Sequence, residues 1–176
     1  MHSFLHLKKT LTLAYFLKDD AICLAMKKRG FGEGNWNGFG GKLEEGESIE
    51  GAAVREISEE SGVTVTPEDL EKVAIVEFHF ADGKHLVVHT FFVRNWEGEP
   101  VETEEMRPEW FAYDAIPYEK MWADDPHWLP RALKGEKLTG VVSFGPDGKS
   151  VTEMEWKQVD NFDEVGKEQR SEFSVR

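Results

Sequence analysis

The stretch from Arg29 to Val63 constrains the fold of this 176-residue chain more than any other part of it. Six glycines stand within its first thirteen residues, at positions 30, 32, 34, 38, 40 and 41. This density indicates a loop whose backbone approaches a ligand closely or adopts positive φ. A helix is expected after the loop, because Ser48 suits an N-cap and Gly62 suits a left-handed C-terminal stop. The sequence therefore predicts a glycine-rich loop beside a helix that runs to about Ser61.

Three glutamates share one side of that helix. Glu56, Glu59 and Glu60 stand at i, i+3 and i+4, and like charges at this spacing cost roughly 0.2–0.5 kcal/mol per pair. No basic residue four positions away is expected to offset them on that side. A divalent cation would do so, because magnesium takes hard oxygen ligands from a few carboxylates and from substrate phosphates. The alternative is a solvated acidic face, which the neighbouring glycine-rich loop disfavours, since its backbone groups can reach a ligand directly.

The rest of the chain predicts three hairpins, a further short strand and a second helix. The hairpin strands cover 10–17 and 21–27, 73–80 and 85–93, and 137–144 and 151–159, with the additional strand over 108–113 and the helix over 124–133. No repeat or linker divides the chain, so an α+β fold is expected, with helices packed on a mixed β-sheet. Residues 1–9 are expected to be a lead-in and residues 160–176 a polar tail around a domain spanning 10–159.

Charge limits the partners. The net charge of -13 at pH 7 argues against a nucleic-acid polymer or an anionic membrane as partner, because both need a basic face. A small phosphate ligand stays possible, because bound cations can reverse the local sign. The apolar stretch over 11–17 is too short to span a bilayer, and no signal-peptide cleavage site is evident. We expect a cytoplasmic protein, and a monomer on grounds of size and charge.

Cysteine and histidine suggest no second chemistry. Cys23 is the single cysteine, which fits a reducing compartment, and its apolar surroundings indicate a core residue rather than a nucleophile. The histidines, at positions 2, 6, 79, 85, 89 and 127, show no metal-ligand spacing. Those on the predicted strands are interpreted as packing or surface residues.

The segment from Gly41 to Val63 resembles the signature of the Nudix hydrolases. Every required position is present: Gly41, Glu47, Arg55-Glu56-Ile57, Glu59-Glu60 and Gly62-Val63. The resemblance implies the Nudix fold, an α/β/α sandwich with a mixed β-sheet, and Mg²⁺ as cofactor, with Mn²⁺ as a possible substitute. It implies that Glu56, Glu59 and Glu60 are catalytic metal ligands, that Gly40 offers its carbonyl to a metal, and that Glu47 and Arg55 brace the loop. The expected chemistry is metal-assisted attack of water on phosphorus.

Other segments resemble the animal-type oxidised purine nucleoside triphosphatases of that family, over about residues 10–159. These segments are 26–32, 36–42, 105–108 and 121–125. The resemblance implies a substrate site made of Thr12, Lys27, Phe31, Asn37, Phe39, Gly40, Gly41, Lys42, Phe78, Phe80, Trp122, Asp124 and Asp125, with Glu105 as an additional metal-side carboxylate. Two departures stand out: Ala123 replaces a common proline, and a shorter second hairpin makes Leu86 or Val87 the stand-in for a pocket methionine.

The residues themselves fit a purine site. Trp122 offers a flat apolar face, and base–aromatic stacking is worth roughly 1–3 kcal/mol in single-strand binders; its alternative role is core packing. Asp124 and Asp125 precede Pro126 and could instead cap a helix. In a dry pocket, repulsion and desolvation would keep one of the two acids protonated near neutral pH. One acid would then donate and the other accept, so that the pair could read more than one oxidised purine.

Three functional hypotheses follow. The leading one is hydrolysis of oxidised purine nucleoside triphosphates (8-oxo-dGTP, 2-oxo-dATP and O6-methyl-dGTP) to monophosphate and pyrophosphate, which would sanitise the nucleotide pool. The second is a Nudix enzyme for another diphosphate, such as a dinucleoside polyphosphate or a nucleotide sugar; a capped RNA end is disfavoured by the lack of a basic track. The third is a non-catalytic nucleotide-binding module, which is ranked last because all the signature carboxylates are present.

Overall fold

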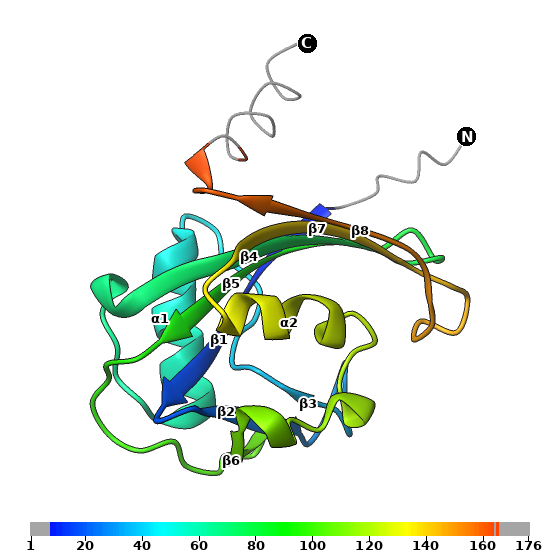
Figure 1. The fold of residues 1–176 in the computed structure, drawn as a ribbon. Helices are drawn as coiled ribbons and strands as arrows, with labels where there is room; N and C mark the ends of the chain where they lie inside the picture. Colours follow the sequence, from blue (N-terminus) through cyan, green and yellow to red (C-terminus); the bar gives the residue numbers. More distant parts are fainter. Residues whose placement is uncertain (1–7, 164, 166–176) are drawn as a thin grey trace.

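The computed structural model describes residues 8–163 and 165, which form a mixed β-sheet with a helix on each side (Figure 1). The strands are β1 (Lys8–Lys18), β2 (Ala21–Lys27), β3 (Trp36–Asn37), β4 (Leu70–His79), β5 (His85–Val93), β6 (Met106–Ala112), β7 (Lys137–Phe144) and β8 (Val151–Val159). The helices are α1 (Ile49–Ser61) and α2 (Asp125–Leu133), with short 3-10 turns at Pro67–Asp69, Tyr113–Ala115 and Tyr118–Lys120.

The sheet mixes parallel and antiparallel pairs. The strand order is β3-β2-β1-β5-β4-β7-β8, and β6 pairs with β2. The β1–β5 and β4–β7 pairs are parallel, whereas the three hairpins are antiparallel. The first hairpin turns at Asp19 and Asp20, both at positive φ (51° and 59°), as a two-residue hairpin loop requires. The predicted hairpins and the mixed sheet are thereby confirmed.

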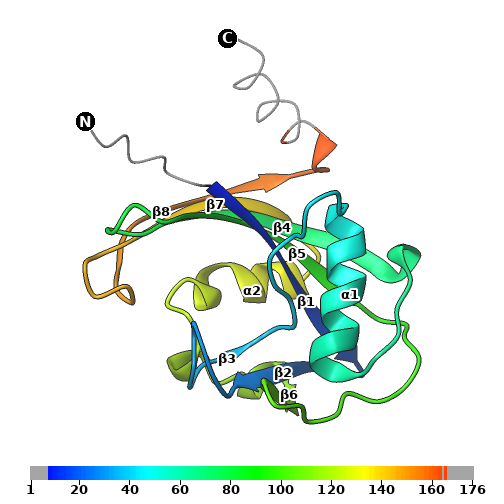
Figure 2. The ribbon, with the colours of Figure 1, turned by 180° about the vertical axis from the view of Figure 1, so that it is seen from behind.

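Strand β1 separates two hydrophobic cores. Tyr15 and Leu17 pack into the core that contains α2, whereas Ala14 and Phe16 pack into the core that contains α1. This alternation follows from the two-residue period of a strand. Figures 1 and 2 show α1 on the outer face of the sheet and α2 in the concave space between β4–β5–β7 and β2–β6. The predicted α/β/α arrangement is confirmed.

Helix α1 begins and ends where the sequence predicts. The Ser48 side chain accepts a hydrogen bond from the amide of Gly51, and Gly62 closes the helix at φ 76°. Ile57 is fully buried against the sheet. These contacts fix the helix between the glycine-rich loop and the sheet, which sets the positions of the glutamates.

The expected lead-in ends earlier than predicted, because Lys8 and Lys9 already belong to β1 and pair with β5. The polar tail predicted over 160–176 lies mostly outside the described residues. Among the described residues, no helix is long and apolar enough to cross a membrane.

Candidate active site

The glycine-rich loop lies directly against β1 and α1. A Cβ atom on Gly40 would stand 1.8 Å from the carbonyl oxygen of Thr12, and one on Gly41 would stand 2.6 Å from the carboxylate of Glu56. The amides of Phe39 and Gly40 donate to Ala14 O and to Glu60 Oε2 (2.8 and 3.1 Å). Both glycines are therefore required by close approach of the backbone rather than by flexibility.

The carbonyl oxygen of Gly40 is left available by this arrangement. The carbonyls on either side, of Phe39 and Gly41, accept hydrogen bonds from the β1 amides of Ala14 and Thr12 (2.7 and 2.9 Å). Among the described residues, no hydrogen bond reaches the carbonyl of Gly40. This oxygen is thus free to act as a ligand beside the carboxylates of α1.

The three helix glutamates differ in environment. Glu60 is 4% exposed, and burial raises its pKa to about 7. Burial also raises the pKa of Glu56, against the opposing effect of Arg55. The Glu59 side chain, in contrast, is 58% exposed. Glu105, immediately before β6, adds a further negative charge that raises the pKa values of Glu56 and Glu60.

Arg55 corrects one expectation. No basic residue was expected to offset the glutamates, yet Arg55 Nη1 donates to Glu56 Oε1 (2.9 Å) and to Glu59 Oε2 (3.2 Å). Its Nε and Nη2 also hold both oxygens of Glu47 (2.7 and 2.8 Å), and Nη2 reaches the carbonyl of Lys42. Arg55 thereby lowers the pKa of Glu47 to about 2. The expected brace between Glu47 and Arg55 is present, and the same guanidinium partly neutralises two of the glutamates.

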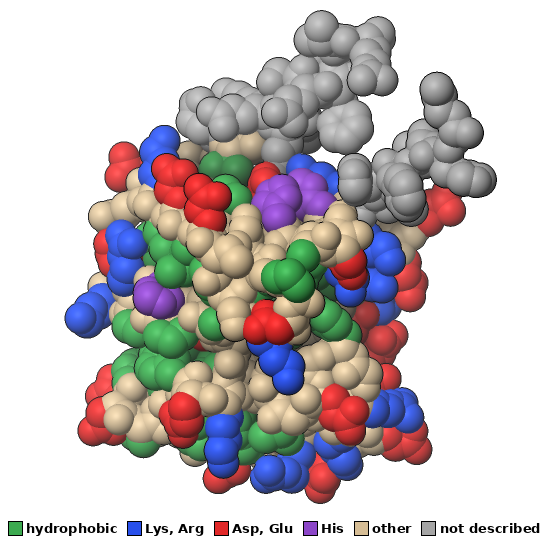
Figure 3. All heavy atoms as spheres, turned by 90° about the vertical axis from the view of Figure 1, so that its right-hand side faces the viewer, with side chains coloured by type: hydrophobic (Ala, Val, Ile, Leu, Met, Phe, Trp, Pro, Cys, Tyr) green, Lys and Arg blue, Asp and Glu red, His purple; other side chains and the backbone are tan. Residues whose placement is uncertain are grey.

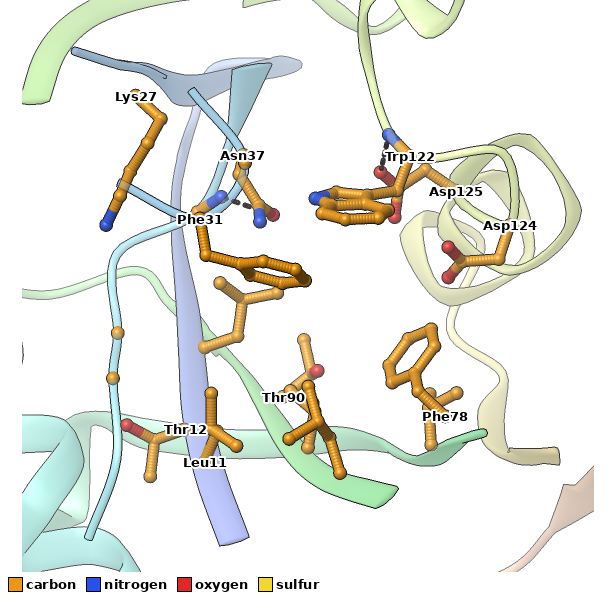
Figure 4. Close-up of a pocket in the computed structure, with 18 of the residues that line it drawn as sticks. Leu11, Thr12, Lys27, Phe31, Asn37, Phe78, Thr90, Trp122, Asp124 and Asp125 are labelled. Atoms are coloured by element: carbon orange, nitrogen blue, oxygen red, sulfur yellow. Dashed lines mark hydrogen bonds between the residues drawn. The ribbon is translucent and has the colours of Figure 1, made fainter. Parts of the chain in front are cut away.

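A cavity of about 280 Å³ opens beside these carboxylates on the concave face of the sheet (Figure 4). Of the predicted substrate residues, its wall contains Thr12, Lys27, Phe31, Asn37, Gly40, Gly41, Lys42, Phe78, Phe80, Trp122, Asp124 and Asp125, and it also contains Glu60. Phe31, at 56% exposure, lies at the mouth, with its ring centroid 5.2 Å from that of Trp122. One cavity therefore joins an aromatic wall to the carboxylates of α1.

Asp124 and Asp125 lie at the closed end of this cavity. They are 1% and 4% exposed. Asp125 accepts hydrogen bonds from the Trp122 amide (3.0 Å) and from Trp128 Nε1 (3.1 Å), whereas Asp124 Oδ1 has no partner among the described residues. Asp124 stands at the N-cap position of α2, but its side chain makes no capping hydrogen bond. Because Asp125 accepts from Trp122 and Trp128, neither carboxylate caps the helix.

Burial determines the charge of this pair. Desolvation raises the pKa of Asp124 to about 7. Desolvation and then the charge of Asp124 raise the pKa of Asp125 well above its ordinary value. Two carboxylates so close in a dry site do not both ionise at neutral pH. The pair can therefore offer a hydrogen-bond donor and an acceptor side by side.

Asn37 provides a further polar group. Its Oδ1 accepts hydrogen bonds from Tyr15 Oη (3.0 Å) and from the amide of Gly38 (2.9 Å). The amide nitrogen of Asn37 is left to donate into the cavity. A planar heterocycle in the cavity beside Phe31 and Trp122 would thus find polar groups of defined direction at its edges.

Phe39 corrects a second expectation. It is buried beside Phe16, with ring centroids 5.4 Å apart, in the core that contains α1. The backbone bridge between Ala14 and Phe39 places this side chain on the far face of β1. Phe39 therefore supports the loop from behind and does not line the cavity.

Several lining residues were not predicted. Phe144 packs against Phe78 and Phe80, with ring centroids 6.0 and 5.1 Å apart. Met106 also lines the cavity. Of the two residues expected to replace a pocket methionine, Leu86 lines the cavity and Val87 does not. The alternation of the last hairpin could have indicated Phe144 as inward-facing, but not which site it would reach.

The donor set fits a divalent cation of the magnesium type. Glu56, Glu60 and Glu105 bring like charges close enough to raise the pKa values of Glu56 and Glu60, and the Gly40 carbonyl adds a further hard oxygen. Carboxylate and carbonyl oxygens are the ligands that such a cation takes. An ion there would remove the mutual repulsion of these groups.

This fold and this carboxylate cradle define a member of the Nudix class. The NUDIX domain model matches residues 8–132, and the chain belongs to this family, whose hydrolases generally use divalent metal ions. The chain is 49% identical to the oxidized purine nucleoside triphosphate hydrolase of Danio rerio, over 77% of this chain and 86% of that protein. It is 44% identical to the protein of that name in Mus musculus, over 86% and 96%. A MutT protein crystal structure from Bacillus halodurans superposes with a TM-score of 0.71 at 28% identity, covering 85% and 97%.

Proposed function

We propose that this enzyme hydrolyses modified purine nucleoside triphosphates, such as 8-oxo-dGTP, 2-oxo-dATP and O6-methyl-dGTP, to the monophosphate and pyrophosphate. The observation that carries the proposal is the buried pair Asp124 and Asp125 at the end of an aromatic cavity that opens onto the α1 carboxylates. The names of the Danio rerio and Mus musculus relatives support it. Such an activity would remove damaged precursors from the nucleotide pool and prevent DNA damage.

The base would lie between aromatic side chains. Trp122 and Phe31 would cover the ring, while Phe78 and Phe80 would form the floor with Phe144. Oxidation of a purine exchanges hydrogen-bond donors and acceptors at its edge. One protonated and one ionised aspartate can pair with either arrangement of donors and acceptors, because the proton can move from one aspartate to the other. Asn37 would add a hydrogen-bond donor.

The triphosphate would extend towards α1. Lys27 and Lys42 line this part of the cavity and would pair with phosphate oxygens. Glu56, Glu59 and Glu60, with Glu105 and the Gly40 carbonyl, would hold Mg²⁺, or Mn²⁺ in its place. The bound metal would supply charge neutralisation on the phosphates and lower the pKa of the attacking water. A carboxylate of α1 would accept the proton of that water.

Cys23 bears on the cellular compartment in which the protein acts. Burial raises the pKa of the Cys23 thiol to about 12, so the thiol is inert and suits a reducing compartment. We propose a cytoplasmic monomer that acts on small-molecule nucleotides rather than on nucleic-acid polymers or membranes.

Pyrophosphate release with Mg²⁺ tests the proposal on a panel of 8-oxo-dGTP, 2-oxo-dATP, O6-methyl-dGTP, dGTP, ADP-ribose and a dinucleoside polyphosphate. Modified purine triphosphates should be turned over faster than dGTP. Glu56→Gln should reduce kcat by about 100-fold or more, whereas Glu50→Gln, the same change in the first turn of α1, should not. Activity mainly on ADP-ribose or the dinucleotide would refute the substrate, and nucleotide binding without turnover would refute catalysis.

A further inference from the structure

Three potential metal ligands gather on the face of the sheet opposite to the cavity. Along β4, Phe78 lines the cavity, so Glu77 and His79 point to the other face. On β5, Leu86 lines the cavity and His85 faces away from it in the same manner. His79 and His85 are direct partners in the antiparallel register. The β4–β5 hairpin therefore brings together residues that linear spacing did not relate.

The distances suit a small cation. The Nε2 atoms of His79 and His85 lie 3.6 and 3.5 Å from the same oxygen of Glu77, Oε2, and one donor atom from each residue lies within 4.8 Å of the others. Ligand atoms about 2.0–2.1 Å from a tetrahedral zinc ion stand roughly 3.3 Å apart. The two imidazole rings are stacked, with centroids 4.2 Å apart and 24° between their planes, so the rings must turn out of this stack before all three donors can meet on one ion.

His85 is prepared for coordination. Its Nε2 is buried and has no hydrogen-bond partner among the described residues. Burial, followed by the charges of His79 and Lys8, lowers the pKa of His85, and Glu77 opposes this shift. A neutral imidazole keeps the lone pair that a metal needs. Lys8, which pairs with His85 across β1 and β5, disfavours a cation, while the Glu77 carboxylate offsets that charge.

The cluster remains accessible to solvent. The His79 side chain is 43% exposed, and histidine side chains lie together near the top of the face shown in Figure 3, with acidic and basic groups around them. An ion can therefore enter and keep water in its remaining coordination positions.

We propose that Glu77, His79 and His85 form a zinc-type transition-metal site, separate from the α1 carboxylates. Two imidazoles and one carboxylate favour zinc, nickel or copper ions, whereas all-oxygen sets suit magnesium. The ion would link β4 to β5 at the end of the hairpin that also carries Phe78 and Phe80. Occupancy should thus stabilise the hairpin without taking part in the hydrolytic site.

Calorimetric titration of the full chain with Zn²⁺ tests the site, with excess Mg²⁺ present to compete for the α1 carboxylates. One zinc equivalent should bind, and His79→Asn or His85→Asn should weaken binding by at least about tenfold. His127→Asn, at an exposed histidine of α2, is the matched control and should leave binding unchanged. Each protein also carries His2→Asn and His6→Asn, because these two histidines lie outside the described residues.

A spectroscopic measurement tests the ligands directly and does not depend on the affinity for zinc. Electron paramagnetic resonance of the Cu²⁺-loaded protein should show two nitrogen ligands, and none in the His79→Asn, His85→Asn double variant. If the double variant loses its far-UV circular dichroism, it is unfolded and cannot be interpreted. Glu77→Gln then takes its place in the zinc titration, where weaker binding is expected. Zinc binding that survives in these variants, or that Mg²⁺ displaces completely, would overturn the site.

Discussion

At Asp124 and Asp125, burial rather than residue type decides which hydrogen bonds the side chains can form. In water both would be acceptors, but at 1% and 4% exposure the pair retains a proton that makes one of them a donor. The sequence indicated adjacent acids near an aromatic residue and left capping open. Only the packing of Trp122 and Trp128 around Asp125 decides between these roles.

The retained proton predicts a dependence of stability on pH. An unfolded aspartate loses its proton near pH 4, whereas folded Asp124 keeps it until its pKa of about 7. Between these values the folded state binds the additional proton, so the free energy of unfolding falls as pH rises through this window. Asp124→Asn removes the titrating group and therefore this loss of unfolding free energy. The unfolding temperature of the variant should exceed that of the wild type by more at pH 8 than at pH 5.

Differential scanning calorimetry at the two pH values measures this gain. Asp114→Asn, at an exposed aspartate, serves as control and should show no such difference. Equal shifts of Asp124→Asn at pH 5 and pH 8 would mean that the folded carboxyl titrates normally.

At the scale of elements, the loop and α1 were predicted from the sequence with their caps, because glycine density and capping residues are local signals. The contacts of Arg55 with Glu56 and Glu59 were not predicted, although all three residues lie on α1 and Arg55–Glu59 is an i,i+4 pair. That the same guanidinium also holds Glu47 depends on the loop folding back on the helix. The position of Phe39 depends likewise on the backbone bridge to Ala14. The packing of Phe39 against the far face of β1 is a contact between elements that local sequence signals do not carry.

Gly40→Ala tests whether the close approach of the loop sets the site. The added methyl would stand 1.8 Å from the Thr12 carbonyl, so the loop must move away from β1 and carry the Gly40 carbonyl with it. Displacements of about 1 Å can cost about 100-fold in rate, and a comparable fall in kcat/KM is expected. Gly145→Ala, where the nearest atom would be 3.3 Å away, is the control, and full activity of Gly40→Ala would contradict the argument.

For the whole molecule, one sheet joins two cores that serve different parts of the site. Ile57 anchors α1 and its carboxylates, and Leu129 anchors α2 and the acid pair; both are fully buried. The α/β/α sandwich that the Nudix resemblance implied agrees with this division. The contact of Phe144 with Phe78 and Phe80 could not be predicted from the sequence, because it depends on the parallel pairing of distant strands.

Ile57→Ala and Leu129→Ala should each lower the free energy of unfolding by about 2–5 kcal/mol. Because both cores share β1, each variant should still unfold in one transition. Urea denaturation followed by tryptophan fluorescence and by far-UV dichroism checks this. Two separated transitions in either variant would show that the cores unfold independently.

The separation of the two cores by β1 also bears on how such a protein can diverge over evolutionary time. The carboxylate helix and its glycine loop are supported mainly from one side of the sheet, and the walls around the acid pair mainly from the other. Substitutions that reshape the walls can accumulate while the groups of the hydrolytic step keep their support. A lineage built on this plan can therefore change its substrate by gradual drift and retain its chemistry throughout.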